Sequence, residues 1–328
     1  MKRTISVAPM MDCTDRHDRF FLRLMSKNVM LYSEMIATKA ALHGDRKKIL
    51  GYSPEEKPLA LQVGGSDKKE LAEVSKIAED MGYDEININL GCPSKKVQKN
   101  KFGACLMKEP DLVSECINEM INSCNIPVTA KTRIGFDDTE DFNYLNKFIH
   151  KMKEAGCKTF ILHARKAILK GLTPKQNLNI PKLNYEMVYK IKEKNPDLEI
   201  IINGGISKIE EIKNHLRTCD GVMIGRAIYQ NPYFLVDIER ELLKVKNSPS
   251  REDIAKELLK YLEKEVKLGT KVNHIMRHAV GLYHGQAGSK NWKRYLSENM
   301  MARDSDFQKA KHIMTIVQNN EKVNQTIA

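Results

Sequence analysis

The chain has 328 residues, of which 41% are hydrophobic, so it can build one large domain and a smaller one. It contains no apolar run of the roughly 18 residues needed to span a membrane and no signal-peptide core, which leads us to expect a cytoplasmic location. Seven cysteines, an odd number without any C-x-x-C pair, argue against a disulfide framework and a zinc ribbon. A formal net charge of +12 favours a polyanionic partner, although a solvated lysine-rich surface would give the same charge.

Eight short apolar segments alternate with amphipathic helical segments up to about residue 226. Eight strand–helix units in about 230 residues predict an α/β fold, a (β/α)8 TIM barrel. A doubly wound open sheet is less suitable, because no glycine-rich loop follows the first strand. We expect Ser66, Asp111 and Ser207 to cap three of the helices. The predicted strands are residues 5–8, 30–34, 59–63, 85–90, 127–132, 159–163, 199–203 and 221–224.

From about Tyr233 the pattern becomes purely helical. The residues Ile254, Leu258, Leu262 and Val266 form one apolar stripe, and further helices are predicted at 272–283 and 306–318. We therefore expect a barrel with the catalytic site at 1–240 and a small helical domain at 241–328.

The helical domain carries a concentration of positive charge. Between Lys271 and Arg303 there are six basic residues and one acidic residue, with aromatic and imidazole groups among them. Such a patch favours nucleic-acid binding through phosphate contacts. We expect Trp292 and Tyr295 to pack between helices. The candidate phosphate contacts are Arg277, Lys290, Lys293 and Arg294.

One thiol lies where a predicted strand opens into a loop, in the segment N-I-N-L-G-C-P at residues 87–93. Gly91 permits a tight turn, and Pro93 holds Cys92 extended, so the thiol points in a defined direction. This arrangement suits a reactive cysteine, although a buried and inert cysteine is an equally good interpretation of these residues alone.

The other ends of the predicted strands carry polar groups and glycines, and catalytic groups of a barrel lie at these ends. Glycines after the seventh and eighth strands predict a phosphate cup, to which an arginine can add a bidentate contact. Gln62, Lys131 and His163 suit a flat heterocycle, and together with the cup they predict an FMN site. Gln62 and His163 have structural alternatives, and Lys131 could instead form a Schiff base. No cluster of carboxylates and histidines suggests a metal.

Several motifs together resemble the tRNA-dihydrouridine synthase family, most closely its bacterial A type. The resemblance covers nearly the whole chain, and the combination of G-C-P-S, K-T-R-I-G and H-A-R-K-A is very specific. The motifs are S-V-A-P-M-M-D-C-T-D-R at 6–16, Y-D-E-I-N at 83–87, G-C-P-S at 91–94, F-G-A-C-L-M at 102–107, K-T-R-I-G at 131–135, H-A-R-K-A at 163–167 and R-Y-L-S-E-N-M at 294–300.

The resemblance implies an FMN-containing barrel, a helical tRNA-binding domain and NADPH as reductant. It implies reduction of uridines 20 and 20a in the tRNA D-loop to 5,6-dihydrouridine. Cys92 would be the proton donor, Asn89 would lie beside the substrate uridine, and Lys175 and Gln176 belong to a loop that also resembles the A type. The residues implied to contact FMN are Pro9, Met10, Met11, Gln62, Lys131, His163, Asn203, Gly204, Gly205, Gly225 and Arg226.

The chemistry of this reduction agrees with the residue types. The C5=C6 bond of uridine needs a hydride at C6, which flavin N5 can supply, and a proton at C5. A free thiol, with a pKa of about 8.5, stays mostly protonated at neutral pH and can give that proton, so Cys92 is expected to act as an acid. Two alternatives remain: an FMN-dependent barrel oxidoreductase acting on a free pyrimidine or enone, and a non-enzymatic RNA-binding protein.

Overall fold

The computed structural model describes residues 4–301, 305, 306 and 308–310, and the chain divides into two compact units. The first unit comprises residues 1–14 and 29–225, and the second comprises residues 15–28 and 226–328. The expected division into a barrel at 1–240 and a helical domain at 241–328 stays a prediction, and the two units differ from it at residues 15–28 and 226–240. The difference arises because segment 15–28 groups with the C-terminal helices.

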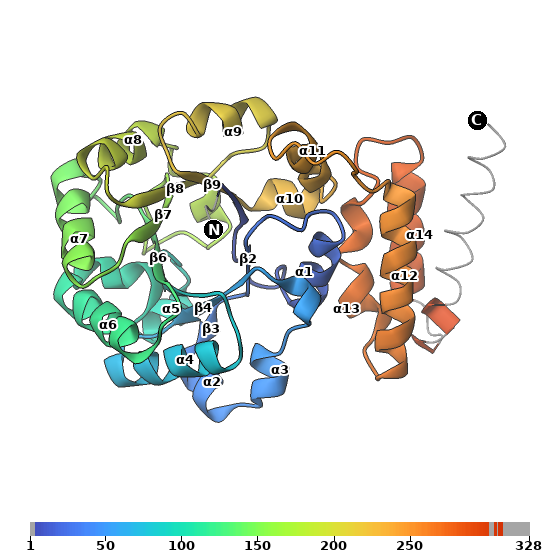
Figure 1. Ribbon diagram of the computed structural model, residues 1–328, viewed down its shortest axis with the longest axis horizontal. Helices are drawn as coiled ribbons and strands as arrows, with labels where there is room; N and C mark the ends of the chain where they lie inside the picture. Colours follow the sequence, from blue (N-terminus) through green and yellow to red (C-terminus); the bar gives the residue numbers. More distant parts are fainter. Residues whose placement is uncertain (1–3, 302–304, 307, 311–328) are drawn as a thin grey trace. The chain divides into compact units, whose positions relative to one another are not determined.

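The first unit is a nearly closed parallel barrel, which confirms the predicted fold. Every strand pair is parallel, and the order around the sheet is β1-β9-β8-β7-β6-β5-β4-β2, with β3 also paired to β4 (Figure 1). A bridge between Ser6 and Met30 joins β1 to the segment before β2. The strands are β1 (Ile5–Val7), β2 (Leu31–Tyr32), β3 (Ile36–Ala37), β4 (Leu59–Gly64), β5 (Glu85–Leu90), β6 (Val128–Arg133), β7 (Thr159–His163), β8 (Glu199–Asn203) and β9 (Gly221–Ile224).

Burial on both faces explains why these segments form central strands. Strands β4 and β5 are buried at every position, because the outer face is covered by helices and the inner face fills the barrel. Side chains from several strands meet in the interior, among them Tyr32, Ile161, Ile201 and Met223. The predicted strand 30–34 is shortened to β2, and β3 follows beyond its end; both short strands pair with β4.

Helices surround this barrel, as Figure 1 shows for α4 and for α6 to α9. Helix α4 begins after Asp67, whose side chain accepts hydrogen bonds from two backbone N–H groups, so the cap is Asp67 and not Ser66. The helices of the first unit are α2 (Thr38–His43), α3 (Arg46–Leu50), α4 (Lys68–Asp80), α5 (Lys95–Lys99), α6 (Pro110–Ser123), α7 (Phe142–Glu154), α8 (Tyr185–Lys194) and α9 (Ile209–His215), with 3-10 turns η1 (Pro54–Glu56), η2 (Gly103–Lys108) and η3 (Gln176–Leu178).

Helices are the only regular secondary structure among the described residues of the second unit. Ser250 caps α12, whose buried residues include the predicted stripe Ile254, Leu258 and Leu262. The predicted helix 272–283 is broken after Met276, and most of the predicted helix 306–318 lies outside the described residues. The helices are α1 (Arg16–Arg23), α10 (Arg226–Gln230), α11 (Phe234–Glu241), α12 (Arg251–Lys267), α13 (Val272–Met276), η4 (Ala279–Gly281) and α14 (Ser289–Met301).

Helix α1 packs among these C-terminal helices. The His17 ring nitrogen Nδ1 lies 2.7 Å from the hydroxyl of Tyr261, and the Phe20 ring stacks on Tyr261 at a centroid distance of 3.8 Å. The Ser26 hydroxyl donates to Glu239 on α11. These contacts explain why the first helix of the chain belongs to the second unit.

Candidate active site

The register of the barrel brings the predicted site residues to neighbouring positions at the carboxyl ends of the strands, called here the barrel mouth. Gln62 on β4 pairs with Asn87 on β5, and Asn89 pairs with Lys131 on β6. His163 on β7 pairs with Asn203 on β8. Because side chains alternate along a strand, Asn87 and Asn89 share one face.

The loop that carries Cys92 is held by hydrogen bonds from both directions. The Asn89 Oδ1 atom accepts from the backbone N–H groups of Gly91 and Cys92, at 3.1 and 2.9 Å. The Cys92 carbonyl accepts from the N–H of Ala104 at 2.9 Å. Gly103 has a φ of +77°, and a Cβ there would lie 2.6 Å from the Cys92 carbonyl oxygen, so only glycine allows this close approach.

The thiol of Cys92 is in an environment that favours its protonated form. Burial raises its pKa above the ordinary value, while the Ser94 N–H and the positive charges of Arg133 and Lys131 act in the opposite direction. The net shift is upward. The thiol is therefore suited to hold a proton at neutral pH, and not to act as a thiolate nucleophile.

Lys131 lies beside this loop with its ammonium group half-buried. Its Nζ atom donates to Asn203 Oδ1 at 3.1 Å, and Asn203 is itself oriented by a bond from Nδ2 to the Met223 carbonyl at 2.8 Å. Burial, together with the charge of Arg133, lowers the pKa of Lys131 to about 7. A negative group brought to the mouth would be stabilised by this lysine and would favour its protonated form.

Arg133 is a residue of the site to which the sequence analysis assigned no role. Its side chain is buried, and its Nε atom donates to the Gly91 carbonyl at 2.9 Å. Its Nη1 atom donates to the carbonyls of Lys166 and Asn177, at 3.0 and 3.3 Å. The guanidinium thus ties the Cys92 loop to the loop after β7. The available signal was its position two residues after Lys131, on the same face of one strand.

The glycines after β8 form a close-fitting turn beside His163. Gly204 and Gly205 have φ values of +121° and +73°, and a Cβ on Gly204 would lie 2.8 Å from His163 Cδ2. The Tyr185 hydroxyl donates to the Gly204 carbonyl at 2.7 Å and holds the turn in place. Only glycine combines these positive φ values with so close an approach to His163. Gly225 follows β9, where a Cβ would lie 3.3 Å from the Met10 sulfur.

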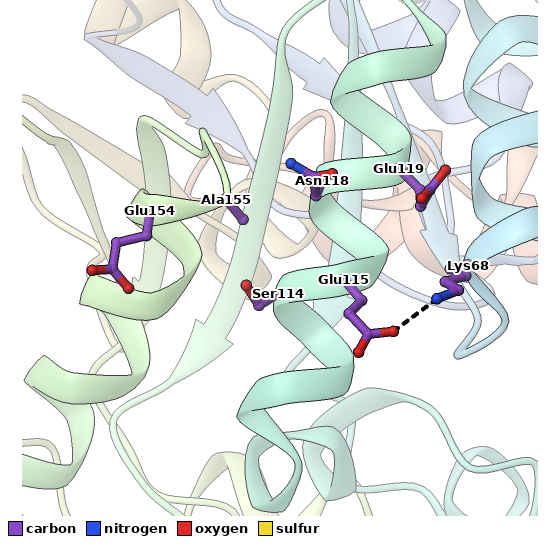
Figure 2. A pocket seen from close by; sticks show the side chains of 7 residues that line it. All are labelled: Lys68, Ser114, Glu115, Asn118, Glu119, Glu154 and Ala155. Carbon is purple, nitrogen blue, oxygen red and sulfur yellow. Dashed lines mark hydrogen bonds and ion pairs between the residues drawn. The ribbon is translucent and has the colours of Figure 1, made fainter.

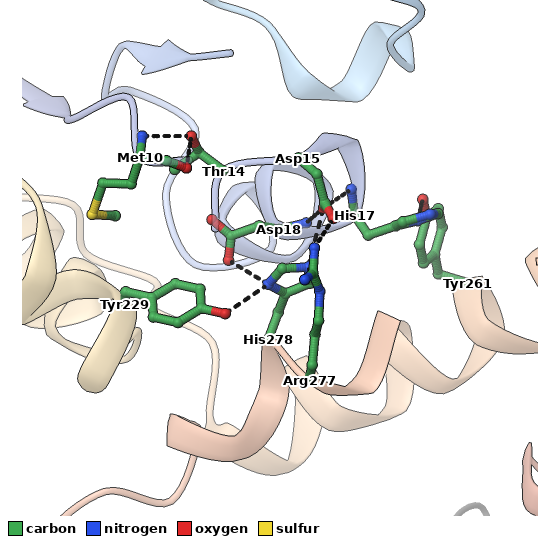
Figure 3. Close-up of polar contacts among 9 residues, drawn as sticks. All are labelled: Met10, Thr14, Asp15, His17, Asp18, Tyr229, Tyr261, Arg277 and His278. Carbon is green, nitrogen blue, oxygen red and sulfur yellow. Dashed lines mark hydrogen bonds and ion pairs between the residues drawn. The ribbon is translucent and has the colours of Figure 1, made fainter. Parts of the chain in front are cut away.

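A compact turn follows β1. The Met10 carbonyl accepts from the N–H groups of Cys13 and Thr14, and the Met10 N–H donates to the Thr14 hydroxyl at 3.0 Å (Figure 3). Pro9 and Met10 are half-buried, whereas Met11 is 54% exposed. The turn therefore presents an apolar side chain to solvent next to the end of a barrel strand.

The loop after β7 is well structured, although its two predicted contact residues are exposed. The Gln176 Oε1 atom accepts from the backbone and hydroxyl of Thr173, both at 2.9 Å. The buried Asn177 accepts from the Ile168 N–H at 2.7 Å. Lys175 extends from this framework into solvent, and its predicted role stays a prediction.

In the second unit, Arg277 forms an ion pair with an acidic residue. Its Nη2 atom lies 2.5 Å from Asp15 Oδ2, and the buried His278 lies between Asp15 and Asp18 at 3.1 and 3.5 Å (Figure 3). Burial opposes ionisation of Asp15, but hydrogen bonds and charge from His278 hold its pKa well below the ordinary value. The structure thus gives Arg277 a stabilising role within this unit.

The other predicted phosphate contacts, Lys290, Lys293 and Arg294, are exposed at or on α14. Arg226, the first residue of α10, is exposed as well. Trp292 is buried, donates from Nε1 to the Ala279 carbonyl at 3.0 Å and packs edge-on against Tyr283, which confirms its expected packing role.

A hollow of about 310 Å³ lies on the first unit. It is bordered by an ion pair between Lys68 and Glu115 at 2.9 Å (Figure 2). None of its lining residues is a predicted site residue. Within the described ranges, no group of His, Cys, Asp and Glu side chains could hold a metal ion, and no helix there has the length and apolar character to cross a membrane.

Comparisons with known proteins agree over most of the chain. A family model described as dihydrouridine synthase matches residues 6–320. A tRNA-dihydrouridine(20/20a) synthase of Shewanella oneidensis is 51% identical over 300 residues, which cover 91% of this chain and 89% of the relative. Proteins of the same name from Synechocystis and Escherichia coli K12 are 49% identical over 298 residues and 48% identical over 314 residues, covering 90% and 95% of this chain and 89% and 91% of the relatives.

The family match covers most of the chain, and the sequence identity is about half, so the similarity extends beyond the fold to the family. The chain belongs to the dihydrouridine synthase family of enzymes.

Proposed function

We propose that this protein reduces uridines 20 and 20a of the tRNA D-loop to 5,6-dihydrouridine, with FMN as cofactor and NADPH as reductant. The observation that carries the proposal is the neutral thiol of Cys92, fixed at the end of β5 by Asn89 and Arg133. The names of the relatives, which specify tRNA and positions 20 and 20a, support the substrate.

The residues at the mouth fit an FMN group. The Gly204–Gly205 turn offers bare backbone beside His163, and Lys131 supplies an amine that a bound negative group would hold in its protonated form. Pro9, Met10 and Met11 provide an apolar edge, and Gln62 provides a side-chain amide. In the proposal the phosphate is held by the glycine turns and Arg226. A reduced flavin bound there supplies the hydride for C6 of uracil.

The protein itself supplies the second half of the reduction. Cys92 holds the proton on its sulfur and donates it to C5 of uracil, and the resulting thiolate regains a proton from solvent. Its upward pKa shift ensures that the acid form predominates at neutral pH. Asn89 lies two strand positions beyond Asn87 and is available to contact the base.

The exposed basic residues of α14 provide a surface for the tRNA backbone. Lys293 and Arg294 lie on one exposed stretch, and Lys290 precedes them by one helical turn. Phosphate contacts of this kind can offset the cost of extracting a base from its stack, which is a few kcal/mol. Because the charge of Arg277 is shared with Asp15, its contribution to the tRNA contact is expected to be smaller.

A pair of cysteine variants tests this function. Purified protein is given FMN, NADPH and tRNA that lacks dihydrouridine, and the product is mapped by mass spectrometry. Cys92→Ala is expected to bind FMN and accept electrons from NADPH yet form no dihydrouridine. Cys105→Ala, which removes another half-buried thiol, is the matched control and should stay active.

The outcomes separate the alternatives. Full activity of Cys92→Ala on tRNA would show that another group is the acid. Wild-type protein that reduces a free pyrimidine but not tRNA would indicate the small-molecule oxidoreductase. Protein without flavin absorbance, even after FMN is added, would leave an RNA-binding role.

A further inference from the structure

A continuous chain of side-chain hydrogen bonds runs through the barrel interior from Glu85 to the Cys92 loop. The Gln62 Nε2 atom donates to Asn87 Oδ1 at 2.8 Å, and Asn87 Nδ2 donates to the Thr129 hydroxyl at 2.8 Å. The Thr129 hydroxyl in turn donates to Glu85 Oε1. Nearer the mouth, Asn89 Nδ2 donates to Gln62 Oε1 at 2.9 Å.

Every link of this chain is shielded from water. Glu85 and Asn87 are 0% exposed, and Gln62 and Thr129 are 1% exposed. Water therefore cannot substitute for a missing partner at low cost, and a donor facing a donor would leave a buried polar group unsatisfied.

The donor-to-acceptor direction of this series of hydrogen bonds is determined at both ends. At the mouth, the backbone N–H groups of Gly91 and Cys92 can only donate, so the carbonyl oxygen of Asn89 must face them. The amide nitrogen of Asn89 then faces Gln62, and each following amide is forced into one orientation. At the far end, the Glu85 Oε1 atom accepts the single proton of the Thr129 hydroxyl, which leaves the Thr129 oxygen to accept from Asn87.

We propose that Glu85, Thr129 and Asn87 are positioning residues that determine which way the Gln62 amide faces at the mouth. With its Oε1 atom bonded to Asn89 and one Nε2 proton bonded to Asn87, Gln62 has one N–H left, and no described residue accepts it. Gln62 therefore presents a donor to the bound group. The group opposite offers an acceptor, a carbonyl oxygen or an unprotonated ring nitrogen, as an oxidised flavin does.

A side-chain amide can donate and accept, and these contacts leave Gln62 only the donor role at the mouth. It rests on the proposed function only for the identity of the bound group. The orientation of the amide follows from the contacts within the protein.

Three substitutions distinguish positioning from general packing. Thr129→Val keeps the shape of the side chain but removes the hydroxyl that joins Asn87 to Glu85. Thr129→Ser retains the hydroxyl and should restore wild-type behaviour. Tyr32→Phe removes a different donor to the same Glu85 oxygen, at 2.9 Å, and this bond lies outside the route from Glu85 to Gln62.

The first measurement is FMN affinity, determined by flavin fluorescence during titration of the apoprotein. Thr129→Val should raise the Kd about tenfold, the effect of losing one well-formed hydrogen bond. Thr129→Ser and Tyr32→Phe should stay within about threefold of the wild type. Should Thr129→Val fail to fold, Asn87→Leu interrupts the same chain at its middle and is expected to give the same loss.

The second measurement is independent of FMN. In the apoprotein, the side-chain amide resonances of Gln62 and Asn89 should shift in Thr129→Val and remain in place in the two controls. Unchanged resonances and unchanged affinity in Thr129→Val, or equal losses in all three variants, would overturn the positioning role. If the wild type binds no FMN but the resonances respond as described, the proposed function fails while the positioning role stands.

Discussion

Burial of Lys131 lowers the free energy of unfolding of the barrel, and replacing this lysine should stabilise the protein. Burial lowers the pKa of this lysine from 10.5 to about 7. The unfolded chain therefore binds more protons than the folded chain between pH 7 and pH 10.5, so this group makes the protein less stable at low pH and the cost declines as pH rises through that window. Lys131→Met removes the cost.

The expected size follows from the pKa shift and from the hydrogen bond to Asn203, which methionine cannot make. Lowering the pKa from 10.5 to about 7 corresponds to about 5 kcal/mol at pH 6 and about 2 kcal/mol at pH 9. Because Lys131 is only half-buried, solvent screening leaves about half of each figure. Loss of the hydrogen bond to Asn203 removes about 1 kcal/mol. Lys131→Met should thus be more stable by about 1–2 kcal/mol at pH 6 and nearly equal to wild type at pH 9.

The assay must report on the barrel. The only tryptophan of the chain, Trp292, belongs to the second unit, so its fluorescence is unsuitable. Oxidation of the buried core residue Met223 by hydrogen peroxide across a urea titration, read by mass spectrometry, reports unfolding of the first unit at both pH values. Lys170→Met, at an exposed position, is the control. A destabilised Lys131→Met at pH 6, or a difference that does not change with pH, would refute the reasoning.

Two further predictions concern Arg133 and the basic surface of α14. Replacing Arg133 by Met removes a positive charge near the thiol, so the pKa of Cys92 should rise further and the pH profile of its alkylation should move to higher pH. Arg133→Lys keeps the charge and should move the profile less. An unchanged profile in Arg133→Met would contradict the proximity of the two groups. Charge reversal at Lys293 and Arg294 should weaken tRNA binding and lower the salt slope by about 0.7–0.9 for each phosphate that is no longer neutralised, with flavin content unchanged. The same reversal at Lys76 and Lys190 on the barrel helices is the control, and equal affinities over several salt concentrations would remove α14 from the interface.

The barrel could be predicted from sequence because its strands are short apolar runs buried on both faces. Seven of the eight predicted segments match a single strand closely, and the exception is the second position, where β2 and β3 share the pairing to β4. Local preference predicts that a cap lies near residue 66, but it does not choose between adjacent candidates. The side chain that reaches the helix N-terminus is Asp67.

The polar interior of the site could be predicted only in part. Gln62, Asn89 and Lys131 lie at strand ends, where barrel chemistry is expected. Thr129 and Arg133 acquire their roles from partners more than forty residues away, Glu85 and Gly91, and no local pattern shows such partners. The break in the predicted helix 272–283 likewise reflects tertiary contacts, since His278 is fixed there by Asp15 and Asp18.

The grouping of segment 15–28 with the C-terminal helices has a consequence for how the protein is made. The chain leaves the barrel after Thr14 and returns at Val29, and Val7 and Met30 on either side of this excursion are joined by a backbone hydrogen bond of 2.9 Å. The buried contact of His17 can form only after Tyr261, 244 residues later in the sequence, has been synthesised. During synthesis on the ribosome the amphipathic α1 therefore emerges long before its partners. A chain shortened to the barrel would leave this helix without the partners that bury His17 and Phe20.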